Sequence, residues 1–396
     1  MKLIAKLVAG ILLGIAAGLV APLWMIQLLL TFKALFGQLL FFTIPLLILF
    51  FITSGIAGLP RNSGRLLGRT LAAAYLSTVV AGLLAFFAAA ALVPFLTSAA
   101  SVVVADNGTV PDPFLTLEIP PLLGIMSALA AAFIFGPGIA ATGADQLKTL
   151  FDQGRDVIEK LLVVVIIPLL PIYIAGVFAE LAVAGTVFET LRTFGVVLAL
   201  SISLHWAWIV VLFGIVGLKA RRSPFGRIRT MLPAYLTALG TMSSAATIPV
   251  TLQAARNNGV SKRTADFAVP LCATTHLAGS TITIVACAIA VMVLHDALAV
   301  PSLLTMLPFI LTLGVVMLAA PGVPGGAVMA AVGLLGSMLG FGETAVALMI
   351  ALYMAQDSFG TACNVTGDGA IALWVDEAEA IEDEPQVTEE QASAAR

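Results

Sequence analysis

Charge is scarce in this sequence. Only 10% of its 396 residues are Asp, Glu, Lys or Arg, and 60% are apolar, whereas ordinary soluble domains are about 25% charged and about 45–50% apolar. A soluble chain of this kind would expose large hydrophobic patches and aggregate. The net charge of −3 provides no basic field for nucleic acid. The composition excludes a soluble enzyme, a nucleic-acid-binding protein and a disordered chain, and it predicts an all-α polytopic membrane protein.

Cysteine and chemical motifs are also scarce. The three cysteines, Cys272, Cys287 and Cys363, all lie in apolar stretches, so they do not predict a disulfide framework. Spacings typical of metal sites, catalytic triads and phosphate-binding loops are absent. We therefore expect no enzymatic activity and no cofactor, apart from a bound cation such as Na⁺.

Long apolar runs dominate the chain. A helix needs about 20 apolar residues to span a bilayer. The candidate segments are 3–31, 34–58, 66–98, 121–141, 157–184, 193–218, 231–255, 265–294, 302–340 and 342–375. The first run has no obvious cleavage site and is followed at once by another, so we do not expect a signal peptide.

Most basic residues lie in four connections between the apolar runs. They gather at 61–69, 148–160, 219–229 and 256–263, whereas 99–120 contains three acids and no Lys or Arg. Because basic loops favour the cytoplasm, we expect a protein of the cell membrane with both termini and all basic loops inside, and with 99–120 outside.

Two segments do not fit a single crossing. Segment 231–255 separates two basic loops that should lie on the same side of the membrane. This favours a re-entrant hairpin with its tip at 239–244. The alternative is one ordinary helix, with one basic loop outside against the positive-inside rule. Segment 302–340 would be about 58 Å long as one helix, and its centre, 320–326, is rich in Pro and Gly. Such paired, interrupted segments are typical of transporter binding sites.

The last apolar segment carries two acids where no base is near in sequence. No Lys or Arg occurs between 264 and 395. Asp357, Thr361, Asn364 and Asp368 stand at i, i+4, i+7 and i+11, so they share one helical face. A carboxylate in the membrane needs a partner, a proton or a cation, which points to a cationic ligand. Acids that reach out to the membrane interface are the alternative.

A polar cluster at 274–281 interrupts another apolar segment. Gly279 among hydroxyl residues predicts local unwinding, which frees carbonyl groups for ion coordination. His276 lies near mid-membrane and is expected to be functional. His205, beside two tryptophans, is expected to be a packing residue. The acids that begin at Asp376 are expected to form a solvated end.

Four motifs resemble one family. Residues 243–251 (SSAATIPVT) are similar to the serine-rich first hairpin tip of dicarboxylate/amino acid:cation symporters, the glutamate-transporter family. Residues 270–280 resemble its "PLGAT…NMDGT", 322–326 its second hairpin tip, and 357–368 its "D…T..NVTGD". The order matches up to about residue 375, with features of the serine/threonine branch.

The resemblance implies a homotrimer in membrane lipid, each subunit having eight transmembrane helices and two re-entrant helical hairpins. It implies a scaffold at 1–65 and 121–218, and a transport part at 66–98 and 223–375 that moves as an elevator. Residues 376–396 are then an acidic cytoplasmic tail.

The resemblance also implies roles for individual residues. Asp357 would hold the amino group of a small-molecule substrate, and Asn364 with Ser243–Ser244 would hold its α-carboxylate. The implied substrate-binding residues are Ser243, Ser244, Val323, Gly325, Asp357, Gly360, Thr361 and Asn364. The implied cation-coupling residues are Tyr75, Thr78, His276, Asn364 and Asp368, with Asp368 and Asn364 as ligands of Na⁺.

The departures from the family pattern concern the substrate. Relatives that carry aspartate or glutamate typically have an arginine at the position of Gly360 or of Met242. A buried acidic side chain without a cation would cost several kcal/mol. We therefore expect symport of a small neutral amino acid of Ser, Thr or Ala size; a dicarboxylate or acidic amino acid is the alternative.

Other departures concern the coupling ion. Three oxygen-bearing side chains of the sodium-coupled pattern are here His276, Ala278 and Ala320. We expect fewer coupled Na⁺ ions than in typical relatives, with coupling to protons or no coupling to an ion as the two further outcomes. The alternative is a single coupled Na⁺ at Asp368 beside a neutral His276. Two remoter classes are a channel and an intramembrane hydrolase that pairs Ser243 or Ser244 with His276.

Overall fold

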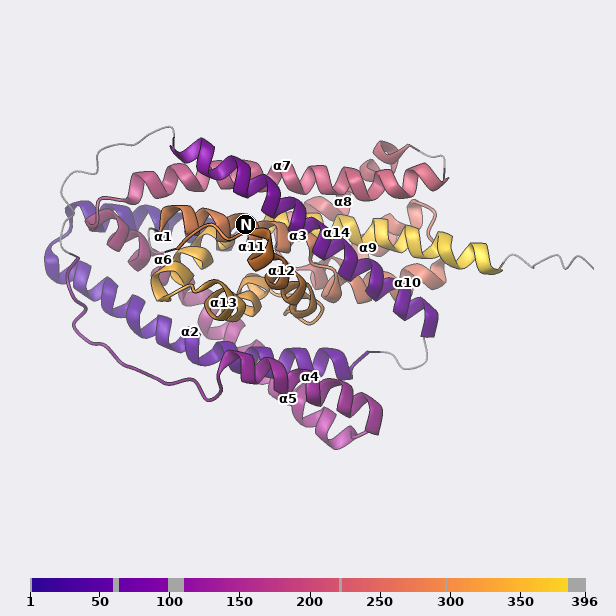
Figure 1. The fold of residues 1–396 in the computed structure, drawn as a ribbon, viewed down its shortest axis with the longest axis horizontal. Helices are drawn as coiled ribbons and strands as arrows, with labels where there is room; N and C mark the ends of the chain where they lie inside the picture. The colour runs from indigo at the N-terminus through magenta and orange to yellow at the C-terminus, as the bar shows by residue number, and fades with distance from the viewer. Residues whose placement is uncertain (1, 60–63, 99–109, 221–222, 296–297, 384–396) are drawn as a thin grey trace, which may run out of the picture.

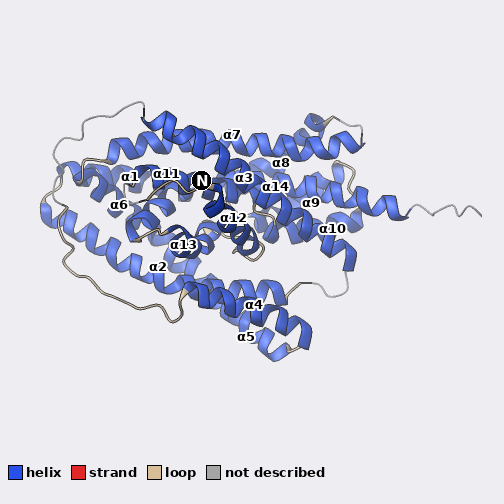
Figure 2. Ribbon diagram, in the orientation of Figure 1, coloured by secondary structure: helices blue, strands red, loops and turns tan. Residues whose placement is uncertain are grey.

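Apolar runs form helices in this chain because a helix satisfies its own backbone hydrogen bonds, which lipid cannot do. The computed structural model describes residues 2–59, 64–98, 110–220, 223–295 and 298–383, and all its regular elements there are helices (Figure 2). They are α1 (Lys2–Val20), α2 (Leu23–Ala57), α3 (Gly64–Ser98), α4 (Ile125–Thr142), α5 (Asp145–Leu161), a π-helical turn (Leu162–Ile166), α6 (Ile167–Val183), α7 (Val187–Ala220), α8 (Pro224–Thr241), α9 (Ser244–Asn257), α10 (Lys262–Thr275), α11 (Ala278–Leu294), α12 (Leu303–Met317), α13 (Gly326–Leu339) and α14 (Glu343–Asp383). Eight helical stretches of the described chain are long and apolar enough to cross a membrane.

Three sequence-predicted segments have the wrong limits. Segment 34–58 begins too late, because α2 starts at Leu23 and is unbroken through residues 31–34. Segment 3–31 is not one helix, because the chain breaks before α2, where Pro22 is extended (φ −66°, ψ 152°). Proline lacks the N–H that a continuing helix would need. The helix expected at 157–184 begins instead at Asp145, with a polar, amphipathic α5 that hydropathy alone does not reveal.

The helices pack in two groups (Figure 1). In the first, α1 packs on α6, and α2 packs on α4, α5 and α6. In the second, α11 and α14 contact each other and are surrounded by α3, α7, α8, α9 and α10. Nearly every residue of α11 is buried, as expected for a helix that is apolar all round. The α11–α14 pair is the centre of the second group.

Glycines allow α1 to lie directly on α6. Gly10, Gly14 and Gly18 recur every four residues, and a Cβ at each would collide with a backbone carbonyl of α6. Small residues at this spacing are typical of helix contacts in membranes, where close backbone approach replaces the hydrophobic effect. This contact holds α1 against α6 within the first group.

The end of α14 is not the solvated end that the sequence predicted. The carboxylate of Asp376 accepts hydrogen bonds from the Ser261 hydroxyl (2.5 Å) and backbone N–H (3.1 Å). Glu377 pairs with Arg227 and Glu379 with Arg69. These acids tie the end of α14 to α3, to the start of α8 and to the α9–α10 turn. Residues 384–396 of the predicted tail lie outside the described part.

We predict that Gly14→Ala lowers the stability of the protein. Its Cβ must separate α1 from α6, and overpacking of this kind costs about 1–3 kcal/mol. Thermal unfolding in detergent measures the effect. Gly195→Ala in α7 is the control, because a Cβ there meets nothing within 4 Å and alanine is the better helix former. An unchanged melting temperature for Gly14→Ala would contradict the close contact.

Candidate functional site

The first break that builds the site lies between α8 and α9. Met242 has a left-handed backbone (φ 56°), and Ser243 caps α9 by accepting a hydrogen bond from the N–H of Ala246 (3.3 Å). Arg227, near the start of α8, and Ser261, just after α9, both reach the end of α14. The two helices therefore run out and back to the same end of the molecule, and the predicted break within 239–244 is confirmed.

A second break, between α12 and α13, meets the first. Gly325 has φ +76°, and a Cβ there would lie 2.7 Å from the sulfur of Met354, so glycine is required at this position. The Ser243 hydroxyl donates to the carbonyl of Gly322 (2.9 Å). The expected interruption at 320–326 is confirmed, and the two breaks are joined by this hydrogen bond.

A third break separates α10 from α11 at His276–Leu277, as the polar cluster at 274–281 predicted. It leaves the first N–H groups of α11 without helical partners. The amide oxygen of Asn364 accepts from Gly279 N (2.7 Å) and Ser280 N (3.2 Å), and its Nδ2 donates to Ser280 Oγ (2.9 Å). Asn364 therefore caps α11.

Asp357 lies beneath the second break. Its carboxylate accepts a hydrogen bond from the backbone N–H of Gly325 (2.7 Å), and the Tyr353 hydroxyl lies beside it. The side chain is 4% exposed, and none of the ion pairs between described residues involves it. The carboxylate has only neutral partners there, which suits it to receive a cationic group.

Asp368 lies on the same side of α14, beside the third break. Its Oδ1 is 2.8 Å from Nδ1 of His276, and Nε2 of that ring is 2.8 Å from the hydroxyl of Ser77 in α3. Asp368 is 1% exposed. The alternative that these acids reach the membrane interface is therefore wrong for both Asp357 and Asp368.

Several predicted residues have local partners instead. The Thr361 hydroxyl donates to the carbonyl of Asp357 (2.9 Å), and that of Thr78 to Ala74 in its own helix (2.8 Å). The Tyr75 hydroxyl donates to the carbonyl of Leu311 in α12 (3.2 Å). Tyr75 and Thr78 are thus not brought to Asp368 by any of these bonds.

The remaining predicted residues surround the breaks. Ser244 is buried at the start of α9. Val323 lines a cavity of about 470 Å³ with Ser243, Gly322 and, from α5, Arg155. Gly360 packs against α11: a Cβ there would lie 3.3 Å from the Thr283 hydroxyl.

His205 was expected to be a packing residue, and its environment agrees with that role: it is buried, and its Nε2 lies 3.0 Å from the carbonyl of Gly279 and 3.1 Å from the Thr283 hydroxyl. One further residue at the site was not predicted. Ser77 belongs to none of the motifs. Its only signal in the sequence is a hydroxyl group in an otherwise apolar helix.

The residues around Asp368 do not form a good Na⁺ site. Hard cations take several oxygen ligands. Here an imidazole occupies Oδ1 of Asp368, and the amide oxygen of Asn364 is held by α11. Among the described residues no cluster of three or more His, Cys, Asp or Glu could hold a metal.

The hydrolase alternative fails on geometry. It required His276 to activate Ser243 or Ser244, but both ring nitrogens of His276 are engaged by Ser77 and Asp368. Ser77, His276 and Asp368 have the order of a catalytic triad, but His276 is fully buried. The comparisons below also identify a family that is not enzymatic.

Comparison with known proteins also argues against an enzyme. The profile of the sodium:dicarboxylate symporter family matches residues 3–378. Excitatory amino acid transporter 1 of Homo sapiens is 28% identical over 277 residues, which are 64% of this chain and 48% of that protein. The serine/threonine transporter SstT of Acinetobacter baylyi is 29% identical over 275 residues, 68% of this chain and 67% of that protein.

The chain matches about half the length of excitatory amino acid transporter 1, and its helices are long and apolar enough for a multi-pass membrane protein. Three helix breaks converge on two buried carboxylates, as expected for a transporter. Because the family match extends over nearly the whole chain, the protein belongs to the sodium:dicarboxylate symporter family, a family of transporters and not of enzymes.

Proposed function

We propose that this protein is a secondary active transporter that carries a small neutral amino acid with a reduced requirement for Na⁺. The observation that carries the proposal is Asp357, a buried carboxylate whose partners in the described chain are neutral. An α-ammonium group is the cation that such a site can bind by charge-assisted hydrogen bonds.

In this proposal the bound substrate replaces two hydrogen bonds of the structure, Gly325–Asp357 and Ser243–Gly322. An ammonium group at Asp357 replaces the N–H of Gly325, which moves the α12–α13 connection away. An α-carboxylate at the first break replaces the Ser243–Gly322 bond, and the positive ends of α9 and α13 favour its charge. Asn364 contributes to the same carboxylate site if its amide turns from α11.

The substrate class follows from the surroundings of Gly360. Gly360 faces Gly279 and Thr283 and supplies no guanidinium for a second carboxylate, and Arg155, which lines the cavity beside Val323, is already paired with Asp156 and bonded to Ser54. The name of the serine/threonine transporter SstT fits a neutral substrate. The excitatory amino acid transporters represent the alternative, an acidic amino acid or dicarboxylate.

We also propose an elevator mechanism in a homotrimer. The first helix group is the scaffold, and the second group together with α12 and α13 is the transport part. The packing of α7 on α3, α8, α11 and α14 supports its assignment to the transport part, whereas the sequence had placed 121–218 in the scaffold. The cavity beside Val323 lies between α2, α5 and the two breaks, which suits it as a route for substrate to Asp357.

The membrane arrangement is likewise a proposal. We propose that α8–α9 and α12–α13 are re-entrant hairpins and that both termini are cytoplasmic. The bonds that bring Arg69, Arg227 and Ser261 to the end of α14 support a common side for these basic loops. The positive-inside rule assigns that side to the cytoplasm.

We predict that serine, alanine or threonine competes with labelled serine for uptake, and that aspartate does not. Gly360→Arg should raise aspartate affinity by about 10-fold or more, because a buried charge-assisted hydrogen bond contributes about 1.5–3 kcal/mol. Inhibition constants in proteoliposomes measure both effects.

Gly360→Ala is the matched control for that substitution. It adds the same Cβ near Thr283 without a charge and should leave aspartate a poor competitor. Inhibition of the original protein by aspartate or succinate, with none by serine, alanine or threonine, would refute the neutral substrate.

We predict that uptake persists when choline replaces Na⁺. The imidazole of His276 holds the Asp368 oxygen that a cation would need. His276→Asn frees that oxygen and offers an amide oxygen, so uptake by this variant should become dependent on Na⁺, with at least a several-fold loss in choline. Initial uptake rates in paired Na⁺ and choline buffers, repeated across a pH series, measure the change.

His205→Asn is the control for the coupling test, since His205 contacts Gly279 and Thr283 and has no bond to Asp368. It should not create Na⁺ dependence. If uptake by the original protein vanishes without Na⁺ and is indifferent to pH and to His276→Asn, a single Na⁺ at Asp368 is the coupling ion and this proposal is wrong.

A further inference from the structure

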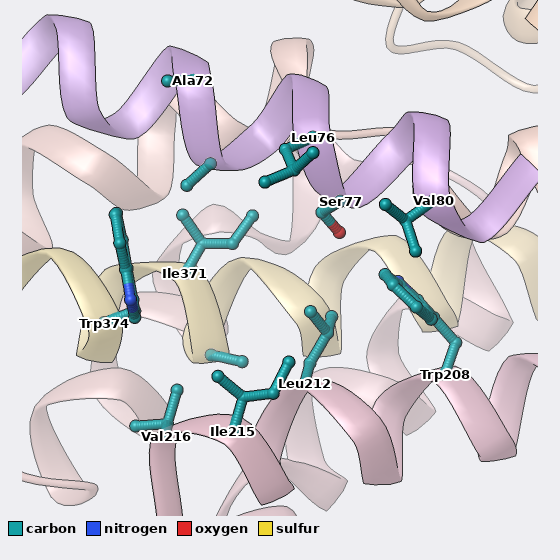
Figure 3. A pocket seen from close by; sticks show the side chains of 12 residues that line it. Ala72, Leu76, Ser77, Val80, Trp208, Leu212, Ile215, Val216, Ile371 and Trp374 are labelled. Carbon is teal, nitrogen blue, oxygen red and sulfur yellow. The ribbon is translucent and has the colours of Figure 1, made fainter. Parts of the chain in front are cut away.

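A narrow apolar groove separates α3, α7 and α14. Its volume is about 330 Å³, within the range of small-molecule sites. Figure 3 shows side chains from the three helices facing one another across it, with Trp374 near one end and Trp208 near the other. Its lining is apolar except for Ser77 and the indole nitrogens.

The rim of the groove is continuous with the apolar outer surface of the helices. Leu76 and Val80 of α3 are 62% and 40% exposed, and Ile215 of α7 is 54% exposed. Both helices are long and apolar enough to cross a membrane. At this surface the surrounding solvent is the hydrocarbon of the bilayer, so the groove opens to acyl chains and not to water.

The groove runs inward from the polar end of the helices. Trp374 precedes Asp376 and Glu377, which pair with Ser261 and Arg227, and tryptophan is typical of the membrane interface. Along α3 the lining extends from Ala72 to Val80, about 12 Å at the rise of a helix. This direction and length suit an acyl chain from one leaflet.

The inner part of the groove touches the residues of the coupling site. Ser77 forms part of the wall, and its hydroxyl is bonded to His276, which is bonded to Asp368. Trp208 is 4% exposed, and no acceptor among the described residues reaches its indole N–H. The wall of the groove at Ser77 therefore stands between the open side of the groove and this buried polar pair.

We propose that an acyl chain of a membrane phospholipid occupies this groove. The chain enters from the leaflet at the Trp374 end and extends past Ser77 to Trp208. It excludes water from the outer side of Ser77, so that the His276–Asp368 pair stays in surroundings of low polarity. This lipid site is separate from the substrate site at Asp357.

Quenching of tryptophan fluorescence by brominated acyl chains tests the site. The chain has four tryptophans, so a variant with Trp24→Phe, Trp206→Phe and Trp374→Phe reports on Trp208 alone. It is reconstituted in phosphatidylcholine vesicles with or without bromine at mid-chain, and a helical circular dichroism spectrum with a cooperative thermal transition confirms that it is folded. We expect strong loss of Trp208 fluorescence in the brominated vesicles, although the side chain is buried from the outer surface.

A filled groove provides the matched comparison. Ala73→Phe places a ring in the groove, whereas Ala91→Phe adds the same ring at an exposed position of α3 that does not line it. Quenching should fall in the first variant and stay unchanged in the second. No quenching of Trp208, or equal quenching in both variants, would overturn the proposal, whatever amino acid the protein transports.

Discussion

Every helix break inside a membrane protein exposes backbone groups that lipid cannot satisfy, and this requirement organises the whole second helix group. Each of the three breaks is satisfied by one polar side chain: Ser243 at the first, Asp357 at the second and Asn364 at the third. An unsatisfied group would cost several kcal/mol in hydrocarbon. The side chains that stabilise the fold are therefore the ones available to bind a ligand.

The same need for polar partners inside the protein explains why α11 and α14 are so deeply buried. The polar face of α14 cannot meet lipid, and α3, α7, α8, α9, α10 and α11 surround this helix. Gly279 and Gly360 permit the closest approach, since a Cβ at Gly279 would lie 2.6 Å from that of Cys363. An interior of this density transmits a change at one break to the others, because packed groups have few alternative arrangements.

The neutral substrate that we propose rests on which groups fill the charged positions of the site. Glycine stands at position 360, where a Cβ would lie 3.3 Å from the Thr283 hydroxyl, and Nε2 of His205 from α7 is 3.1 Å from the same hydroxyl. An imidazole likewise holds Asp368. Neutral or weakly basic groups thus replace fixed cations, which is consistent with a substrate and a coupling scheme that carry less charge.

The sequence by itself determined the membrane class, the three helix breaks and the identity of the two buried acids, because length, hydropathy and helix-breaking residues are local properties. It also placed Asp357, Asn364 and Asp368 on one helical face. Only the tertiary structure decided their partners. Ser77 and His276 are far apart in sequence, and no periodicity predicts that they meet. Hydropathy could not show that polar α5 extends the next helix, or that Asp376, Glu377 and Glu379 bond to Ser261, Arg227 and Arg69. These contacts arise from packing between distant elements, where complementarity of shape and charge, and not local propensity, selects the partner.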